Sequence, residues 1–239
     1  IDGGCGANPN YFANFDYYRG PAPWSESEVV AIRDFAYEHQ ILLSIAYHSS
    51  RSGCVSEKVI SSWNWEGEKH SPDYEVISPL GIDIAGLTPN EEYSGYYLPV
   101  SGVSRRGNAH DWFYTHTGAI QYLIEAGSSN LQPEDEELID DTVERNLDGA
   151  FHLMNRAIGY DANGSDIGAE KYQVTGIVTD AVTGMPITAE VIIEEMNGPM
   201  LEPRFTDEFG RYRRLLYPDT FTLVFQARGY ETQNHTITS

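Results

Sequence analysis

Residues 119–126 read AIQYLIEA, a nearly continuous apolar run that ends beside the carboxylate of Glu125. This texture is typical of a β-strand that is buried on both faces of a parallel sheet. Residues 41–49, ILLSIAYHS, have the same texture and end on His48 and Ser49. Two such strands, alternating with helical patterns, predict an α/β fold with a mixed, mostly parallel sheet and flanking helices.

Helical patterns lie on either side of these runs. Residues 25–40, SESEVVAIRDFAYEHQ, lead directly into the first strand. Residues 133–159, PEDEELIDDTVERNLDGAFHLMNRAIG, predict a long amphipathic helix whose first turn is acidic, as the helix dipole favours. The apolar face of that helix is predicted to consist of Leu138, Ile139, Val143, Leu147, Ala150, Phe151 and Met154.

The texture changes after residue 159. Residues 160–170 form a polar linker that contains glycine, and short alternating strands follow it: YQVTGIVTD, AEVIIEE, GRYRRLLY, TFTLVFQARG and ETQNHTIT. Strands of this length, separated by turn residues, predict a small β-sandwich. We therefore expect an α/β domain over 1–159, a linker over 160–170 and an all-β domain over 171–239.

Charge and composition exclude several classes of partner. The chain has 239 residues and a net charge of -21, from 15 Lys and Arg against 36 Asp and Glu. Such a field repels phosphate backbones, so no nucleic-acid partner is expected. No apolar run approaches the ~20 residues that a transmembrane helix needs, so no transmembrane segment is expected. Cys5 and Cys54 lack the CxxC spacing of a redox or zinc-ribbon site, and both a disulfide and two thiols stay open.

Two residues that can bind metal or transfer protons lie at the ends of the predicted strands. In an open parallel sheet, ligands bind beyond the carboxyl ends of the strands, where His48 and Glu125 both lie. A histidine there can bind metal or relay protons, and a partly desolvated glutamate can act as a general base. The alternative is that both are hydrogen-bonded structural residues. The functional interpretation requires the two side chains to share one cleft.

Three segments carry a family resemblance. They are YYRGPAPWSESEVVAIRDF at 17–35, SIAYHS at 44–49 and NAHDWFYTHTGAIQYLIEAG at 108–127. In this order they resemble the zinc metallocarboxypeptidases of the carboxypeptidase A type, and Asp111 stands fourteen residues before Glu125, as in that family. Residues 174–195 and 206–231 resemble the transthyretin-like module that follows the catalytic domain in the carboxypeptidase N/E branch.

The resemblance implies a secreted zinc-dependent metallocarboxypeptidase that hydrolyses C-terminal residues of peptides or proteins. It assigns His48 as a zinc ligand and Glu125 as the general base. It gives Tyr97, or Tyr96 in its place, the role of a flexible tyrosine near the cleft. It places Asn10, Ser49 and His110 at the substrate. An extracellular or secretory location is also favoured by the glycosylation tripeptides at Asn163 and Asn234.

Two departures from the family pattern leave other functions open. None of the seven histidines is followed by Glu three residues later, so the HxxE motif with the other two zinc ligands is absent. The resemblance therefore implies that the N-terminal half of the catalytic domain lies outside this chain. Tyr11 stands where the family has the Arg that binds the substrate carboxylate. The alternatives are a catalytically inactive carboxypeptidase-like binding or scaffold protein, and a structural part of an extracellular assembly.

Overall fold

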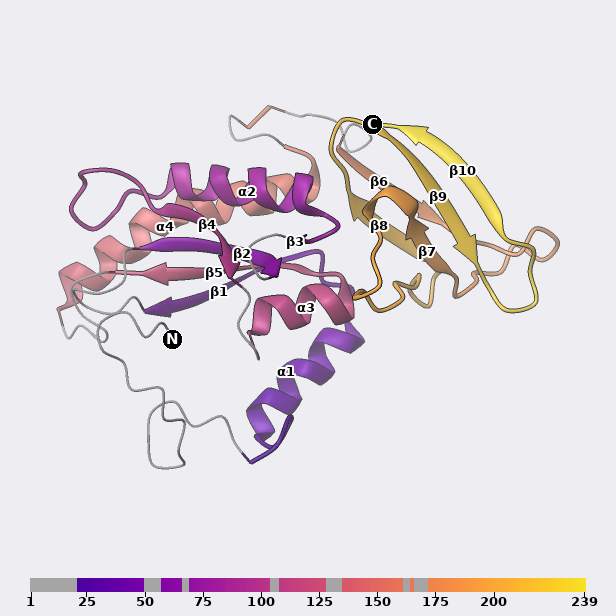
Figure 1. Cartoon of the computed structure of the whole chain (residues 1–239), viewed down its shortest axis with the longest axis horizontal. Coiled ribbons are helices and arrows are strands. Elements are labelled where there is room, and N and C mark those ends of the chain that lie inside the picture. The colour runs from indigo at the N-terminus through magenta and orange to yellow at the C-terminus, as the bar shows by residue number, and fades with distance from the viewer. Residues whose placement is uncertain are drawn as a thin grey trace.

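The computed structural model describes residues 21–49, 57–65, 69–103, 108–127, 135–160, 164–165 and 172–239. An α/β part and an all-β part lie side by side in it (Figure 1). The elements of the α/β part are, in chain order, α1 (Ser27–Glu38), β1 (Leu43–Ser49), β2 (Lys58–Trp65), β3 (Lys69–His70), α2 (Tyr74–Leu87), β4 (Leu98–Val103), α3 (Ala109–Thr117), β5 (Ile120–Ala126) and α4 (Glu136–Ile158).

The two apolar runs form neighbouring strands of a mixed sheet. Within the described residues the sheet has the order β1-β5-β2-β3, and β4 also pairs with β2. β1 is parallel to β5 and β2 is parallel to β4, whereas β2 is antiparallel to both β5 and β3. The mixed sheet with flanking helices is therefore confirmed. Its mostly parallel character is not, because parallel and antiparallel pairings are equally represented among these strands.

Helices cover both faces of this sheet. α2 and α4 pack together on one face, while α3 and α1 lie on the other (Figure 1). Tyr122 of β5 and Ile77 of α2 are fully buried between sheet and helix, and the Tyr122 hydroxyl donates to the Ile77 carbonyl at 2.8 Å. Gly149 allows α4 to approach α2, since a Cβ added there would lie 2.9 Å from Thr88 Oγ1. The centre of the α/β part is thus a closely packed interior.

The all-β part contains all five predicted strands: β6 (Gln173–Ile177), β7 (Glu190–Ile193), β8 (Arg211–Leu215), β9 (Thr220–Gln226) and β10 (Gln233–Thr238), with a short 3-10 helix, η1 (Glu194–Met196), after β7. One sheet has the order β10-β9-β7 and the other pairs β6 with β8, all antiparallel. Leu215, Leu216 and Phe221 are buried in the same apolar cluster as Ile77 of α2. The identity of the all-β part as a transthyretin-like domain, and the domain boundaries, remain predictions.

The apolar face predicted for α4 is not the face that the helix buries. The residues that α4 buries are Arg145, Asn146, Gly149, His152 and Leu153. Most of the predicted apolar face is exposed, with exposed fractions between 42% and 62% for Ile139, Val143, Leu147, Phe151 and Met154, and Ile158 extends it. The predicted residues do share one apolar face, but hydrogen bonds and ion pairs, described below, bring polar side chains of the opposite face into the interior.

Gly118 offers a test of this packing. It ends α3 with a φ of 76°, and a Cβ added there would lie 2.7 Å from Nε of Arg204 in the all-β part. Gly184 has a similar φ of 71° and no neighbour within 4 Å. Replacing a left-handed glycine by alanine costs roughly 1 kcal/mol, and forced packing costs about 1–3 kcal/mol more.

We predict that Gly118→Ala lowers the free energy of unfolding by clearly more than Gly184→Ala does. Chemical denaturation of the two variants and the parent chain measures the difference. Equal losses in the two variants would mean that Arg204 does not occupy the space beside Gly118.

Candidate functional site

His48 and Glu125 lie side by side at the ends of two neighbouring strands. β1 and β5 are parallel, and their register sets the Cα of His48 opposite that of Glu125. Nδ1 of His48 lies 3.4 Å from Oε2 of Glu125. Because both residues are strand residues, the backbone hydrogen bonds of the sheet fix their separation.

The two side chains differ in their access to solvent. The imidazole of His48 is 60% exposed, whereas the carboxylate side chain of Glu125 is 18% exposed. A mostly shielded carboxylate next to an accessible imidazole can exchange a proton with it. The pair can also present one nitrogen and one carboxylate to a cation.

The end of β5 is held in place by Glu57, which precedes β2 and is buried. Glu57 Oε1 accepts a hydrogen bond from the N–H of Gly127, two residues beyond Glu125, at 2.9 Å. Glu57 Oε2 accepts one from the N–H of Glu91 at 2.6 Å. Gly127 has a φ of 72°, which glycine adopts without strain. The hydrogen bond from Gly127 to Glu57 therefore fixes the end of the strand that carries Glu125.

Arg145 of α4 pairs with Glu57 in the interior. Its Nη1 lies 3.0 Å from Glu57 Oε1, and the two side chains are 2% and 4% exposed. Arg145 also donates to the Pro89 carbonyl and, through Nε, to Asp141 at 2.8 Å. Removal of either partner would leave a buried charge without its counterion. Sequence reasoning missed this pair because its members stand 88 positions apart.

Tyr97 belongs to the same buried network. It is 2% exposed, and its hydroxyl accepts hydrogen bonds from Asn146 Nδ2 at 3.3 Å and Arg145 Nη1 at 3.4 Å. Burial raises the pKa of Tyr97 to about 12. Tyr96, the alternative for the flexible tyrosine, is 60% exposed. The role at the cleft stays a prediction, and exposure favours Tyr96 for it.

His110 lies in the first turn of α3 and is 2% exposed. Its Nε2 is 3.6 Å from Asp111 Oδ1, and its backbone carbonyl accepts a hydrogen bond from Ser62 Oγ at 2.9 Å. Burial lowers the pKa of His110 to about 4, so the ring is neutral at pH 7. A neutral, enclosed ring can line an apolar pocket, but its predicted contact with substrate stays a prediction.

Several predicted residues lie outside the part of the chain that the structure describes. These are Asn10 and Tyr11, both cysteines, and the side chain of Ser49. The backbone of Ser49 ends β1 opposite Ala126.

Neither a complete metal site nor a membrane span is found in the described ranges. No cluster of three or more His, Cys, Asp or Glu side chains there could hold a metal ion. His48 and Glu125 are of the right chemical type, but a catalytic zinc needs three protein ligands, so they do not form a zinc site by themselves. Among the described helices, none combines the length and the apolar character that crossing a bilayer requires.

Comparison with known proteins gives this geometry its context. Human carboxypeptidase D is 29% identical over 163 residues, which cover 66% of this chain and 10% of the human protein. Mouse carboxypeptidase D is 24% identical over 235 residues, which cover 90% of this chain and 16% of the mouse protein. The chain therefore spans only a small part of the length of these relatives. A sequence profile of the zinc carboxypeptidases matches residues 6–149, which include β1 and β5 with His48 and Glu125. This chain belongs to the zinc carboxypeptidase family.

Proposed function

We propose that the protein acts as a zinc-dependent metallocarboxypeptidase that removes C-terminal residues from peptides or proteins. The observation that carries the proposal is the 3.4 Å approach of His48 to Glu125 inside the segment that matches the family. An imidazole and a carboxylate at adjoining strand ends are the groups that metal-assisted hydrolysis of a peptide bond needs.

Glu125 would act as the general base. Its carboxylate takes one proton from the attacking water as the oxygen forms a bond to the scissile carbonyl carbon. It then delivers that proton to the amine nitrogen as the C–N bond breaks, which restores the carboxylate. The small exposed fraction of Glu125 limits competing exchange with bulk water, and the Glu57–Gly127 hydrogen bond holds the strand end that carries it.

His48 would provide one protein ligand to zinc, and its 60% exposed ring is accessible to an ion. Zinc supplies Lewis-acid polarisation of the carbonyl and of the attacking water when it is bound. We propose that the other protein ligands come from the N-terminal half of the catalytic domain, outside this chain. The extracellular or secretory location and the transthyretin-like identity of the all-β part belong to the same proposal.

The exposed face of α4 supports a docking site for the N-terminal half of the catalytic domain. Six apolar side chains line this face over the full length of the helix: Ile139, Val143, Leu147, Phe151, Met154 and Ile158. β1, which contacts α4, pairs within the described residues with β5 alone and so leaves one edge for a further strand. Exposed apolar surface beside an unpaired strand edge is typical of an interface. The remainder of the catalytic domain would add a strand to β1 and cover α4.

A second candidate function is a carboxypeptidase-like binding or scaffold protein without activity. The observation that favours it is Tyr11, a neutral residue where the family has an Arg for the substrate carboxylate. A tyrosine hydroxyl gives one neutral hydrogen bond where arginine gives a bidentate, charge-assisted pair of hydrogen bonds, so binding of a free C-terminal carboxylate is weaker.

We predict that Glu125→Gln lowers the kcat for C-terminal hydrolysis by about 10²–10⁴-fold, because the amide cannot accept the proton. The protein that carries this chain together with the remaining zinc ligands is assayed on peptides with free C-termini. Glu92→Gln, an exposed acid, serves as the matched control. Unchanged turnover in Glu125→Gln would contradict the role of this residue, and an inactive parent protein would favour the second candidate.

We predict that His48→Gln weakens zinc binding by more than the 10–100-fold that is typical of a residue that only supports a ligand. Competition with a chromogenic zinc chelator measures the dissociation constant for zinc without any activity assay, in the protein that carries this chain together with the remaining zinc ligands. His235→Gln, on β10, is the control, since that residue is exposed and in the all-β part. Equal zinc affinity in the two variants would remove His48 from the ligand set.

We predict that the double change Val143→Glu and Phe151→Glu reduces the binding of a hydrophobic dye to the isolated chain. The free energy of unfolding of that chain should change by no more than about 0.5 kcal/mol per site, as is usual at exposed positions. In the longer protein the same change should disrupt packing and lower stability. Leu153→Glu, at a buried position on the same helix, should destabilise both forms. Identical behaviour of the double variant in the two forms would contradict the docking site.

A further inference from the structure

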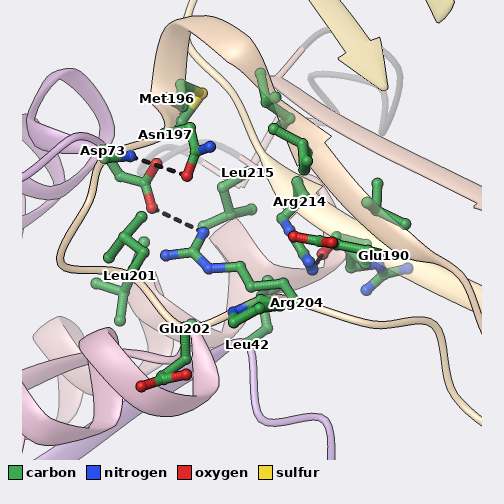
Figure 2. Close-up of a pocket in the computed structure, with 18 residues that line it drawn as sticks. Leu42, Asp73, Glu190, Met196, Asn197, Leu201, Glu202, Arg204, Arg214 and Leu215 are labelled. Atoms are coloured by element: carbon green, nitrogen blue, oxygen red, sulfur yellow. Dashed lines mark hydrogen bonds and ion pairs between the residues drawn. The ribbon is translucent and has the colours of Figure 1, made fainter. Parts of the chain in front are cut away.

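A cavity of about 150 Å³ lies between the α/β part and the all-β part (Figure 2). Leu42, Asp73 and Gly118 line it from the α/β part, and Arg204 and Arg214 line it from the all-β part. The cavity is separate from His48 and Glu125, neither of which lines it. Of the three arginines that line it, Arg204 and Arg214 have buried side-chain nitrogens without a hydrogen-bond partner.

Arg204 uses one of its guanidinium nitrogens on a carboxylate. Nη1 donates to Asp73 Oδ2 at 3.1 Å, and the Arg204 side chain is 13% exposed (Figure 2). Its Nε and Nη2 atoms are buried and have no hydrogen-bond partner. These two N–H groups share one edge of the planar guanidinium, and such an edge binds two oxygens of a single oxyanion.

Arg214, on β8, is the second enclosed cation of the cavity, whereas Arg213, which also lines it, is exposed and donates to the Ala157 carbonyl. Its Nη1 donates to the backbone carbonyl of Arg213 at 2.9 Å, while Nη2 is buried without a partner. Burial, together with the nearby charge of Arg204, lowers the pKa of Arg214 to about 9. The protonated side chain therefore lies where its charge has little local compensation.

Only one of the three acidic residues at the cavity is enclosed with Arg204 and Arg214. Among the described residues, Asp73 with Arg204 is the one ion pair that joins lining side chains. Glu190 and Glu202 also line the cavity, but Glu202 is exposed and Glu190 is partly exposed, and neither lies within 4.0 Å of Arg204 or Arg214 nitrogen atoms. Two enclosed guanidinium groups thus face one enclosed carboxylate, and a buried cation without a counterion is unfavourable.

We infer that this cavity binds a small inorganic oxyanion of the sulfate or phosphate type through the unpartnered nitrogens of Arg204 and Arg214. The anion accepts the hydrogen bonds that Arg204 and Arg214 leave unused and supplies a counterion for the enclosed Arg214. Because Asp73 precedes α2 and both arginines come from the all-β part, a bound anion stabilises the contact between the two parts. The site does not depend on the proposed hydrolase activity.

Thermal unfolding of the full chain at pH 7 and constant ionic strength tests the site, with sodium chloride exchanged for sulfate, phosphate or acetate. We expect the Tm to rise with sulfate and phosphate along a saturating curve, as ligand binding to the folded state requires. A general effect of salt would instead raise the Tm with anion concentration without reaching saturation. Isothermal titration with the same anions measures the stoichiometry, which should be one per chain.

Arg214→Met is the decisive variant, and Arg228→Met, an exposed arginine of the all-β part, is its control for net charge. Arg214→Met should fold without loss of Tm in chloride, since it removes a buried charge, and should lose the saturable response. Arg228→Met should keep that response. An equal response in both variants, a response that never saturates, or saturable binding of acetate alone would each overturn the inference.

Discussion

The parallel pairing of β1 with β5 is the interaction on which the candidate site depends. It sets His48 opposite Glu125 through the backbone hydrogen bonds of the sheet, so no loop has to position either side chain. On the other side of β5, Lys58 of β2 lies opposite Glu125, and Glu57 binds the backbone just beyond the strand. The edge of the sheet that carries the proposed chemistry is therefore held from both sides.

Buried charges fix the geometry around this sheet. The Arg145–Glu57 pair joins α4 to the start of β2, and the Arg204–Asp73 pair joins the all-β part to the α/β part. Desolvation offsets much of the Coulombic attraction in such pairs, so their contribution lies in orientation more than in net stability. They also explain why α4 turns a polar face inward, since Arg145 and Asn146 find partners in the interior that compensate for their burial.

The sequence was informative wherever a segment's local pattern agreed with its environment. The runs that became β1 and β5, and the five short strands of the all-β part, were identified from apolar texture and turn residues alone. The strands β2 and β4 and helix α2, which contains Pro79, were not predicted. The Glu57–Arg145 pair could not be found either, because neither residue carries a local signal of its distant partner. The apolar face of α4 was correctly read as apolar, but burial depends on what covers the helix, which no local pattern encodes.

We propose that His48 and Glu125 belong to one zinc-dependent site. Anomalous scattering at the zinc edge from crystals of the longer protein, grown with zinc, tests it most directly. We expect one strong peak about 2.0–2.1 Å from a nitrogen of His48, with the Glu125 carboxylate beside the ion. A zinc ion bound elsewhere in an intact domain, with His48 and Glu125 contacting only each other, would contradict it.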